Sequence, residues 1–313
     1  MSETDQPDNS DYEYRKSRFS TMQEHWAVNR IHDLMVDYIP TDQELNDLRF
    51  AIMLYISKAL YFDYTDDEIE FMKRVDANRE TRDNVTPNGG VVPKKEYQLE
   101  YNMVLRSWSK IIQSIIKGRP ELMTRFRYTP NIRIKFGLEL EDNVDRSLNT
   151  SYPHSDAWVE GPWSMNCYTP LLGDVKNNNL IFWTPKSAET FSDKFLATAA
   201  TYEEMQWVLD YYDFNEDLSP KKGRIHISDF SLIHATHRED NCGTRISIDT
   251  TVIVGNHDVH GDRMSEYLDE LKIMGEEIVI STNRSIKQDS YDENKTTFSH
   301  YTTGSLQLHE CNK

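Results

Sequence analysis

The sequence predicts a mainly β fold, an antiparallel sandwich or jelly roll, with helices packed against its outside. Two observations carry this prediction. Residues 15–122 place apolar side chains at three- and four-residue steps, the period of a helix. After Pro130 the chain breaks into short apolar or alternating segments separated by turns, a pattern typical of antiparallel β folds and not of parallel α/β sheets.

The helical part comes first. One helix is expected behind the cap candidates Thr41 and Asp42, with apolar positions recurring as far as Leu60. A second is expected over 95–117, and the segment 84–93 between them contains two prolines and two glycines and is interpreted as a loop. The first 12 or so residues and the tail after about Arg284 are polar and aperiodic, so we interpret them as peripheral.

The β part follows. Strands are expected at 131–136, 163–171, 180–183, 223–228, 231–235 and 244–254, with a helical insertion at 202–212. A helix at 262–274 and an edge strand at 277–281 would close the fold. No clean linker is present, so we expect one compact unit in three parts: a helical buttress at 1–125, a β core at 126–260 and a C-terminal segment at 261–313.

Composition excludes several classes of protein. The net charge is −17 and no long basic run occurs, which argues against a nucleic-acid partner. Cys167, Cys242 and Cys311 are far apart and odd in number, so neither a disulfide framework nor a zinc–thiolate site is expected. The start is acidic and polar, and no apolar run reaches membrane length. We therefore expect a cytoplasmic protein with no membrane partner.

The first motif with chemical meaning is a histidine and an aspartate two positions apart. In an extended backbone alternate side chains project to the same side, so His154 and Asp156 can reach one ion. Alone, such a tripeptide is common by chance and does not indicate a metal.

A second motif begins at His234, which ends an apolar stretch. After a polar turn, Arg245, Ser247 and Asp249 alternate with two isoleucines, so that one strand has a polar and an apolar face. Ten residues separate His234 from Arg245, enough for the chain to turn into a neighbouring strand. A guanidinium forms paired hydrogen bonds to a carboxylate, and the Ser247 hydroxyl can reach the same group. The pattern favours a small dicarboxylate bound beside a metal.

The two motifs together form a known combination. Two imidazoles and one carboxylate on one side of an ion leave the other side open, as in the facial triad of non-haem iron(II) oxygenases. As a set, His154-x-Asp156, His234 and Arg245-x-Ser247 resemble the motifs of the iron(II)/2-oxoglutarate-dependent dioxygenases. The stretches 153–170 and 234–249 are similar to the phytanoyl-hydroxylase-like branch, which includes oxygenases of carbohydrate and aminoglycoside gene clusters. The resemblance covers about 131–254.

This resemblance implies a double-stranded β-helix, jelly-roll or cupin-like, with the triad at its mouth. It implies iron(II), 2-oxoglutarate and O2 as cofactors, with Arg245 and Ser247 on the C5 carboxylate and Asn166 or Tyr168 near 2-oxoglutarate. The implied activity is hydroxylation or desaturation of a small-molecule metabolite, derived from a sugar, an aminoglycoside or an amino acid, with decarboxylation of 2-oxoglutarate to succinate and CO2. The retained Asp156 favours these reactions over halogenation, which needs its coordination position.

Several residues keep two interpretations. His237 could replace His234 as the ligand, but only seven residues then remain before Arg245, so it is expected at the entrance or in solvent. Arg133 either contacts an anionic substrate or pairs with a neighbouring acid. Trp158 and Trp163 either form an aromatic wall over the substrate or pack in the core.

Other functions are weighed against the oxygenase. The run Gly255-Asn256-His257-Asp258 resembles the metal-binding turn of calcineurin-like phosphoesterases, but the other motifs of that fold are missing in order. A jelly-roll binding protein without catalysis, and the same oxidation acting on a peptide or protein, remain the alternatives.

Overall fold

The protein is described by a computed structural model, which covers residues 10–119, 122–126, 130–137, 149–191, 193–254, 271–274 and 277–280. One group of strands forms a seven-stranded sheet: β1 (Asn29–His32), β2 (Met35–Tyr38), β3 (Met123–Phe126), β4 (Asn131–Lys135), β5 (Met165–Gly173), β8 (Ile225–Asp229) and β10 (Arg245–Val254). A second group forms a three-stranded sheet: β6 (Asn178–Pro185), β7 (Tyr212–Asn215) and β9 (Ile233–Arg238).

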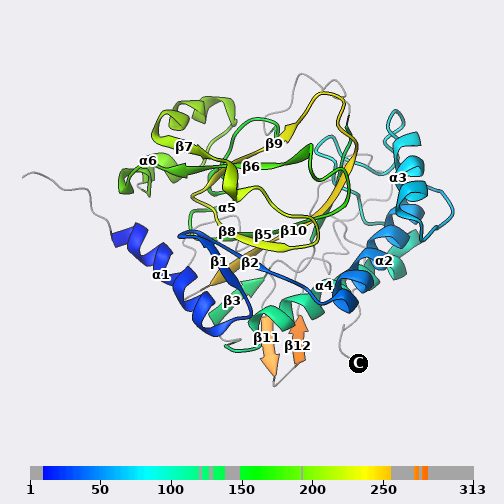
Figure 1. Cartoon of the computed structure of the whole chain (residues 1–313), viewed down its shortest axis with the longest axis horizontal. Helices are drawn as coiled ribbons and strands as arrows, with labels where there is room; N and C mark the ends of the chain where they lie inside the picture. Colours follow the sequence, from blue (N-terminus) through cyan, green and yellow to red (C-terminus); the bar gives the residue numbers. More distant parts are fainter. Residues whose placement is uncertain are drawn as a thin grey trace, which may run out of the picture.

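The two sheets confirm the jelly-roll prediction. The larger runs β1-β2-β8-β5-β10-β3, with β4 also paired to β10, and the smaller runs β7-β6-β9; every pairing is antiparallel. The chain crosses from β5 to the small sheet, returns at β8, crosses again at β9 and returns at β10. From β5 to β10 the chain thus passes back and forth between the two sheets, with β6 and β7 both in the small one, which is the winding of a double-stranded β-helix. In Figure 1 the small sheet lies across one face of the large one.

Helices cover the opposite face of the large sheet (Figure 1). They are α1 (Ser10–His25), α2 (Asp42–Ala59), α3 (Glu68–Ala77) and α4 (Gln98–Ile116), the last preceded by the 3-10 turn η1 (Lys95–Tyr97). Thr41 caps α2 in a capping box with Glu44, as the sequence predicts. Apolar side chains of α2 and α4 share one core with Ile246 and Ile248 of β10, so the helices buttress the strand that carries Arg245.

Helix α1 is joined to the large sheet by buried charges. Arg15 and Arg18 each place a guanidinium nitrogen 2.7 Å from a carboxylate oxygen of Asp229, at the end of β8. All three residues are buried. A buried carboxylate is stable as an ion only when it is paired. The packing of α1 and the end of β8 therefore depend on each other.

The N-terminal half is not wholly helical. The segment 29–38 forms the hairpin β1–β2, and β2 adds to the large sheet by pairing with β8. The interpretation of 15–122 as helical was wrong here, because a four-residue strand is too short to show an alternating pattern. All four residues of β2 are buried, and Asp37 among them is balanced by Arg224 at 2.8 Å.

Two further predictions concern helices near the insertion and the C-terminus. The insertion is helical, but its main element, η4 (Glu203–Tyr211), is a 3-10 helix, preceded by the short turns η3 (Ala188–Phe191) and α6 (Asp193–Leu196). The end of the predicted C-terminal helix is instead a strand, β11 (Leu271–Met274), paired with β12 (Glu277–Ile280). A strand is present where one was predicted at 277–281, but it pairs only with β11 in a separate two-stranded sheet and not at the edge of the core. The rest of 262–274 lies outside the described residues.

The sequence also predicted no disulfide framework and no membrane span. Cys167 and Cys242 are buried free thiols, while Cys311 lies outside the described residues. Among the helices that the structure describes, none is both long and apolar enough to cross a membrane.

Candidate metal centre and co-substrate site

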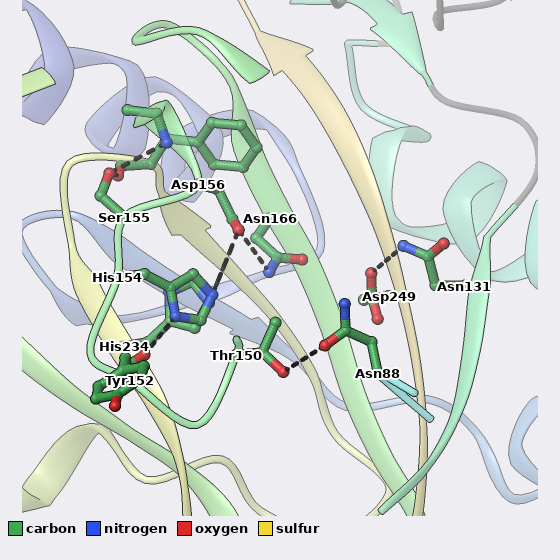
Figure 2. Close-up of polar contacts among 12 residues, drawn as sticks. Asn88, Asn131, Thr150, Tyr152, His154, Ser155, Asp156, Asn166, His234 and Asp249 are labelled. Atoms are coloured by element: carbon green, nitrogen blue, oxygen red, sulfur yellow. Dashed lines mark hydrogen bonds and ion pairs between the residues drawn. The ribbon is translucent and has the colours of Figure 1, made fainter. Parts of the chain in front are cut away.

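Three predicted ligands meet between the two sheets. His154, Asp156 and His234 each offer a ligand atom, and these atoms all lie within 4.8 Å of one another. The Nε2 atoms of His154 and His234 lie 4.0 Å and 3.9 Å from the nearest Asp156 oxygens. Atoms this close can all bind one ion at the usual distance of about 2.0–2.2 Å. The structure therefore brings the two distant motifs together in the way the sequence predicts (Figure 2).

A short bridge places the two histidines side by side. The backbone N–H of each donates to the carbonyl oxygen of the other at 2.9 Å, so the segment before α5 (Ala157–Glu160) lies along β9. The expectation of an extended His-x-Asp was only half right, because Asp156 has helical backbone angles at the start of α5. That turn directs the carboxylate toward the two imidazoles.

The backbone also selects the protonation state of His154. Its Nδ1 lies 2.8 Å from the carbonyl oxygen of Tyr152, which can only accept, so Nδ1 carries the proton and Nε2 keeps its lone pair. Burial lowers the pKa of His154 well below its ordinary value, and the neighbouring His234 lowers it further. His154 is therefore neutral at physiological pH, the form that binds a metal.

The carboxylate of Asp156 is oriented from β5. Asn166 donates its amide N–H to Oδ2 of Asp156 at 3.1 Å (Figure 2). Asn166 was expected near 2-oxoglutarate, and the structure places it on a metal ligand. Between the two ligands, the buried Ser155 hydroxyl donates to the carbonyl oxygen of Phe230 at 2.5 Å and ties this segment to the turn before β9.

The predicted co-substrate residues lie on neighbouring strands of the large sheet. Arg245 and Ser247 share a face of β10, and Tyr168 of β5 pairs in register with Asp249 on that same face. The Arg245 guanidinium lies 5.7 Å from the centre of the Tyr168 ring. Burial raises the pKa of Tyr168 and lowers that of Arg245, whose guanidinium nevertheless stays charged.

Several buried polar atoms at this place lack a hydrogen-bond partner of normal geometry among the described residues. Nε of Arg245 and the hydroxyls of Ser247 and Tyr168 are buried and have no hydrogen-bond partner of normal geometry among the described residues. Arg245 is 1% exposed, and its hydrogen bond to the carbonyl oxygen of Asn178 is long, at 3.4 Å. A buried cation with unused donors is costly without an anion. The donor set fits the carboxylate of a 2-oxo diacid.

Arg133 pairs with an acid, one of its two expected roles. Its Nε lies 2.6 Å from Oδ1 of Asp249, and Asn131 donates to Oδ2 of the same carboxylate at 2.6 Å. Gly90 forms a bridge with Arg133, so the loop 84–93 lies against β4.

Three other predicted residues lie in different surroundings. Trp158 is buried in a second apolar core and donates its ring N–H to the carbonyl oxygen of Phe195. Trp163 packs against Arg15 of α1, with the guanidinium 4.2 Å from the ring centre. His237 is half-exposed and lies 3.0 Å from Glu239, which leaves His234 as the ligand. The run 255–258, which carries the phosphoesterase alternative, lies outside the described residues.

Sequence reasoning missed a contact from the insertion. The ring of Tyr202 stacks on His154, with centroids 4.3 Å apart and planes 16° apart, and Gln206 donates to the carbonyl oxygen of Pro153 at 2.8 Å. The insertion therefore covers the segment that carries two of the ligands. No local pattern in the sequence signals that an aromatic ring 48 residues away would pack on His154.

Comparison of the chain with known proteins finds similar solved structures but no similar sequence family. No protein-family model and no curated protein matches the chain. Solved structures that it resembles include the non-haem α-ketoglutarate-dependent carbocyclase SnoK of nogalamycin biosynthesis, with TM-score 0.43 and 8% identity over 77% of this chain and 87% of that one. AviO1 of Streptomyces viridochromogenes Tue57 has TM-score 0.36 and 12% identity over 82% and 99%. An N-substituted L-amino acid dioxygenase of Burkholderia ambifaria AMMD, in complex with α-ketoglutarate, has TM-score 0.33 and 10% identity over 76% and 87%.

Proposed function

We propose that the protein is an iron(II)- and 2-oxoglutarate-dependent oxygenase that hydroxylates or desaturates a small-molecule metabolite. One observation carries the proposal: the triad of His154, Asp156 and His234 lies in the same barrel as the buried, incompletely paired guanidinium of Arg245. The triad fits a metal that keeps open positions, and the guanidinium fits the distal carboxylate of a 2-oxo diacid. When bound, iron(II) with 2-oxoglutarate and O2 supplies an oxidant able to remove hydrogen from an unactivated carbon.

The chain's own residues would position the ion and 2-oxoglutarate and exclude water from the metal ligands. His154, Asp156 and His234 would hold the ion, with Tyr152 and Asn166 orienting two of these ligands. Arg245 and Ser247 would hold the far carboxylate of 2-oxoglutarate, with the neutral hydroxyl of Tyr168 next to it. Tyr202 covers one face of His154 and keeps water from that side of the ligand.

The substrate class proposed from the sequence is a metabolite derived from a sugar, an aminoglycoside or an amino acid. Polar side chains to one side of the triad support a polar substrate: Figure 2 shows Thr150 and Asn88 on that side, with Asp249 and Asn131 farther along it. We place the enzyme in the cytoplasm, as its cysteine usage suggests.

Anaerobic titration with iron(II) and 2-oxoglutarate tests the proposal. The wild type should develop the metal-to-ligand charge-transfer band of a chelated 2-oxo acid in the visible spectrum. Asp156→Ala and His234→Ala should abolish the band, and Arg245→Met should shift it to higher 2-oxoglutarate concentration by at least tenfold. His237→Ala is the matched control and should leave it unchanged.

Two results would contradict the proposal. A band of equal strength in wild type and Asp156→Ala would remove Asp156 from the metal. Absence of the band in wild type, together with no formation of succinate in air, would leave a jelly-roll binding protein.

A further inference from the structure

Two stretches of the chain meet at the metal centre. Residues 152–158 carry two of the three predicted ligands and are called the ligand segment, and residues 193–211, which contain α6 and η4, are called the covering segment. The side-chain amide of Gln206 donates to the carbonyl oxygen of Pro153 at 2.8 Å and to that of Tyr202 at 2.7 Å. One side chain thus ties the ligand segment to the residue that precedes η4.

Further contacts hold both ends of the ligand segment. At its start the hydroxyl of Tyr152 donates to the carboxylate of Glu203, a hydrogen bond that raises the pKa of Tyr152. At its end the ring N–H of Trp158 donates to the carbonyl oxygen of Phe195 at 2.7 Å, and the carbonyl oxygen of Trp158 accepts from the backbone N–H of Ala199 at 3.0 Å. The covering segment therefore follows the ligand segment over its whole length.

Apolar side chains of the two segments share one core. Its members from the ligand segment are Ala157 and Trp158, and those from the covering segment are Phe195, Leu196, Tyr202, Met205 and Val208. The helices α2 and α4 pack in a different core, against β10. Since regions with separate cores open with separate free energies, the order of the ligand segment depends more on the covering segment than on the helices.

The imidazole of His154 is held both at one edge and on one face. At the edge, Nδ1 lies 2.8 Å from the carbonyl oxygen of Tyr152. On the face, the ring of Tyr202 stacks with its centroid 4.3 Å away and its plane inclined by only 16°. Rotation of the imidazole about its Cβ–Cγ bond would break this stack and turn Nε2 away from Asp156, which it faces at 4.0 Å (Figure 2). The stacked ring therefore selects the orientation in which His154 can bind a metal together with Asp156.

We propose that Tyr202 is a positioning residue of the metal centre: its ring fixes the plane of the His154 imidazole, so that metal affinity and the docking of the covering segment depend on each other. This inference rests on the proposed function, because it concerns a metal bound at the triad. A metal that binds only one orientation of His154 favours every contact that needs this orientation, and by reciprocity the contact favours the metal by the same factor. The typical strength of an aromatic pair corresponds to a factor of about three to ten in the dissociation constant of the metal.

Manganese(II) affinity, measured from the free ion by electron paramagnetic resonance, tests one direction of this coupling. Tyr202→Leu keeps an apolar side chain but removes the ring, and it should weaken manganese(II) binding about three- to tenfold. Tyr202→Phe keeps the ring and should bind the ion as wild type does. Trp207→Leu is the matched control, because the ring contacts of Trp207 are with Phe195 and Tyr211, inside the covering segment. It should leave the affinity unchanged.

Amide hydrogen exchange tests the other direction. In wild type, saturating manganese(II) should slow the exchange of the backbone amides in 202–211, because the bound metal removes the orientations of His154 that release Tyr202. Tyr202→Phe should retain this protection, and Tyr202→Leu should lose most of it. A role of Tyr202 in folding alone would raise exchange in Tyr202→Leu equally with and without the metal. Melting temperatures of all variants check that they fold, and the measurement on wild type decides the inference even where a variant does not.

Equal manganese(II) affinity of wild type and Tyr202→Leu would overturn the inference. So would a loss in Tyr202→Phe as large as that in Tyr202→Leu, which would assign the effect to the hydroxyl. A loss of the same size in Trp207→Leu would show that any loosening of the covering segment weakens the metal, and exchange in wild type that ignores the metal would show that the two are not coupled; either result contradicts the role of the Tyr202 ring. Failure of wild type to bind manganese(II) at all would count against the proposed function itself.

Discussion

Replacing Asn166 by alanine should weaken binding of the metal ion about tenfold. The Asn166 amide donates to Asp156 at 3.1 Å, and a hydrogen bond to a charged group contributes about 1.5–3 kcal/mol. Here the bond is at the long end of the normal range and the Asp156 side chain is 25% exposed, so we use the lower limit. About 1.4 kcal/mol corresponds to a factor of ten in the dissociation constant. Loss of partners that orient ligands costs a similar 10–100-fold in other metal sites.

The assay is competition for manganese(II), with free ion measured by electron paramagnetic resonance, on wild type and variant. Asn177→Ala is the control, because Asn177 also donates to a carboxylate at 3.1 Å, that of Asp174 in the turn after β5. It should leave metal affinity unchanged. The reasoning fails if the two variants bind manganese(II) equally well. A selective loss of 2-oxoglutarate affinity in Asn166→Ala would instead restore the sequence-based expectation that Asn166 contacts the co-substrate.

Three other perturbations give distinct outcomes. Asp229→Ala leaves the guanidinium groups of Arg15 and Arg18 without this counter-ion, so the free energy of unfolding, measured by urea titration, should fall by about 3–5 kcal/mol. A loss below about 1 kcal/mol would show that the ion pairs add little to stability. Burial lowers the pKa of His226 to about 4, so wild type should lose stability as pH falls from 6.5 towards 4. This loss should exceed that of His226→Gln by up to about 3 kcal/mol, and above pH 7 the stability of the two proteins should show the same pH dependence. Parallel curves of stability against pH would refute a buried neutral His226. Ser155→Ala removes the hydrogen bond to the carbonyl oxygen of Phe230, and both the stability of the protein, by about 1 kcal/mol, and its metal affinity should fall. An unchanged metal affinity would show that Ser155 stabilises the fold without positioning the metal ligands.

The site residues that the sequence pattern identified best are polar side chains two positions apart in the chain. Arg245-x-Ser247 can be found because strand geometry translates two-residue spacing into a shared face, whereas His154-x-Asp156 converges through the turn at the start of α5. The long strand β10 was predicted to within one residue, and its first half shows the alternation of polar and apolar residues from Arg245 to Asp249. Prediction was accurate wherever one local period decided the structure.

Tertiary contacts decided the rest. β2 is a strand because β8 provides its hydrogen bonds and because Arg224 balances its buried Asp37, and neither partner is near in sequence. Asn166 was predicted to lie on a strand, but its contact with Asp156 depends on the turn at α5, which a helical φ and ψ at Asp156 produce. Tyr202 packs on His154 only because the insertion folds back over the ligand segment. No periodicity in the sequence encodes such contacts.

The net charge of −17 and the buried guanidinium of Arg245 follow from different constraints. Charges on the surface are screened over about 8 Å at physiological salt, so they act on solubility and on encounter with other molecules. Between the sheets, Arg245 and Ser247 are almost inaccessible to solvent, and the field there is set by the few side chains on β4 and β10. An acidic protein can therefore hold a buried cation such as Arg245, because the composition describes the surface while the interior charge depends on which residues alternate inward along a strand.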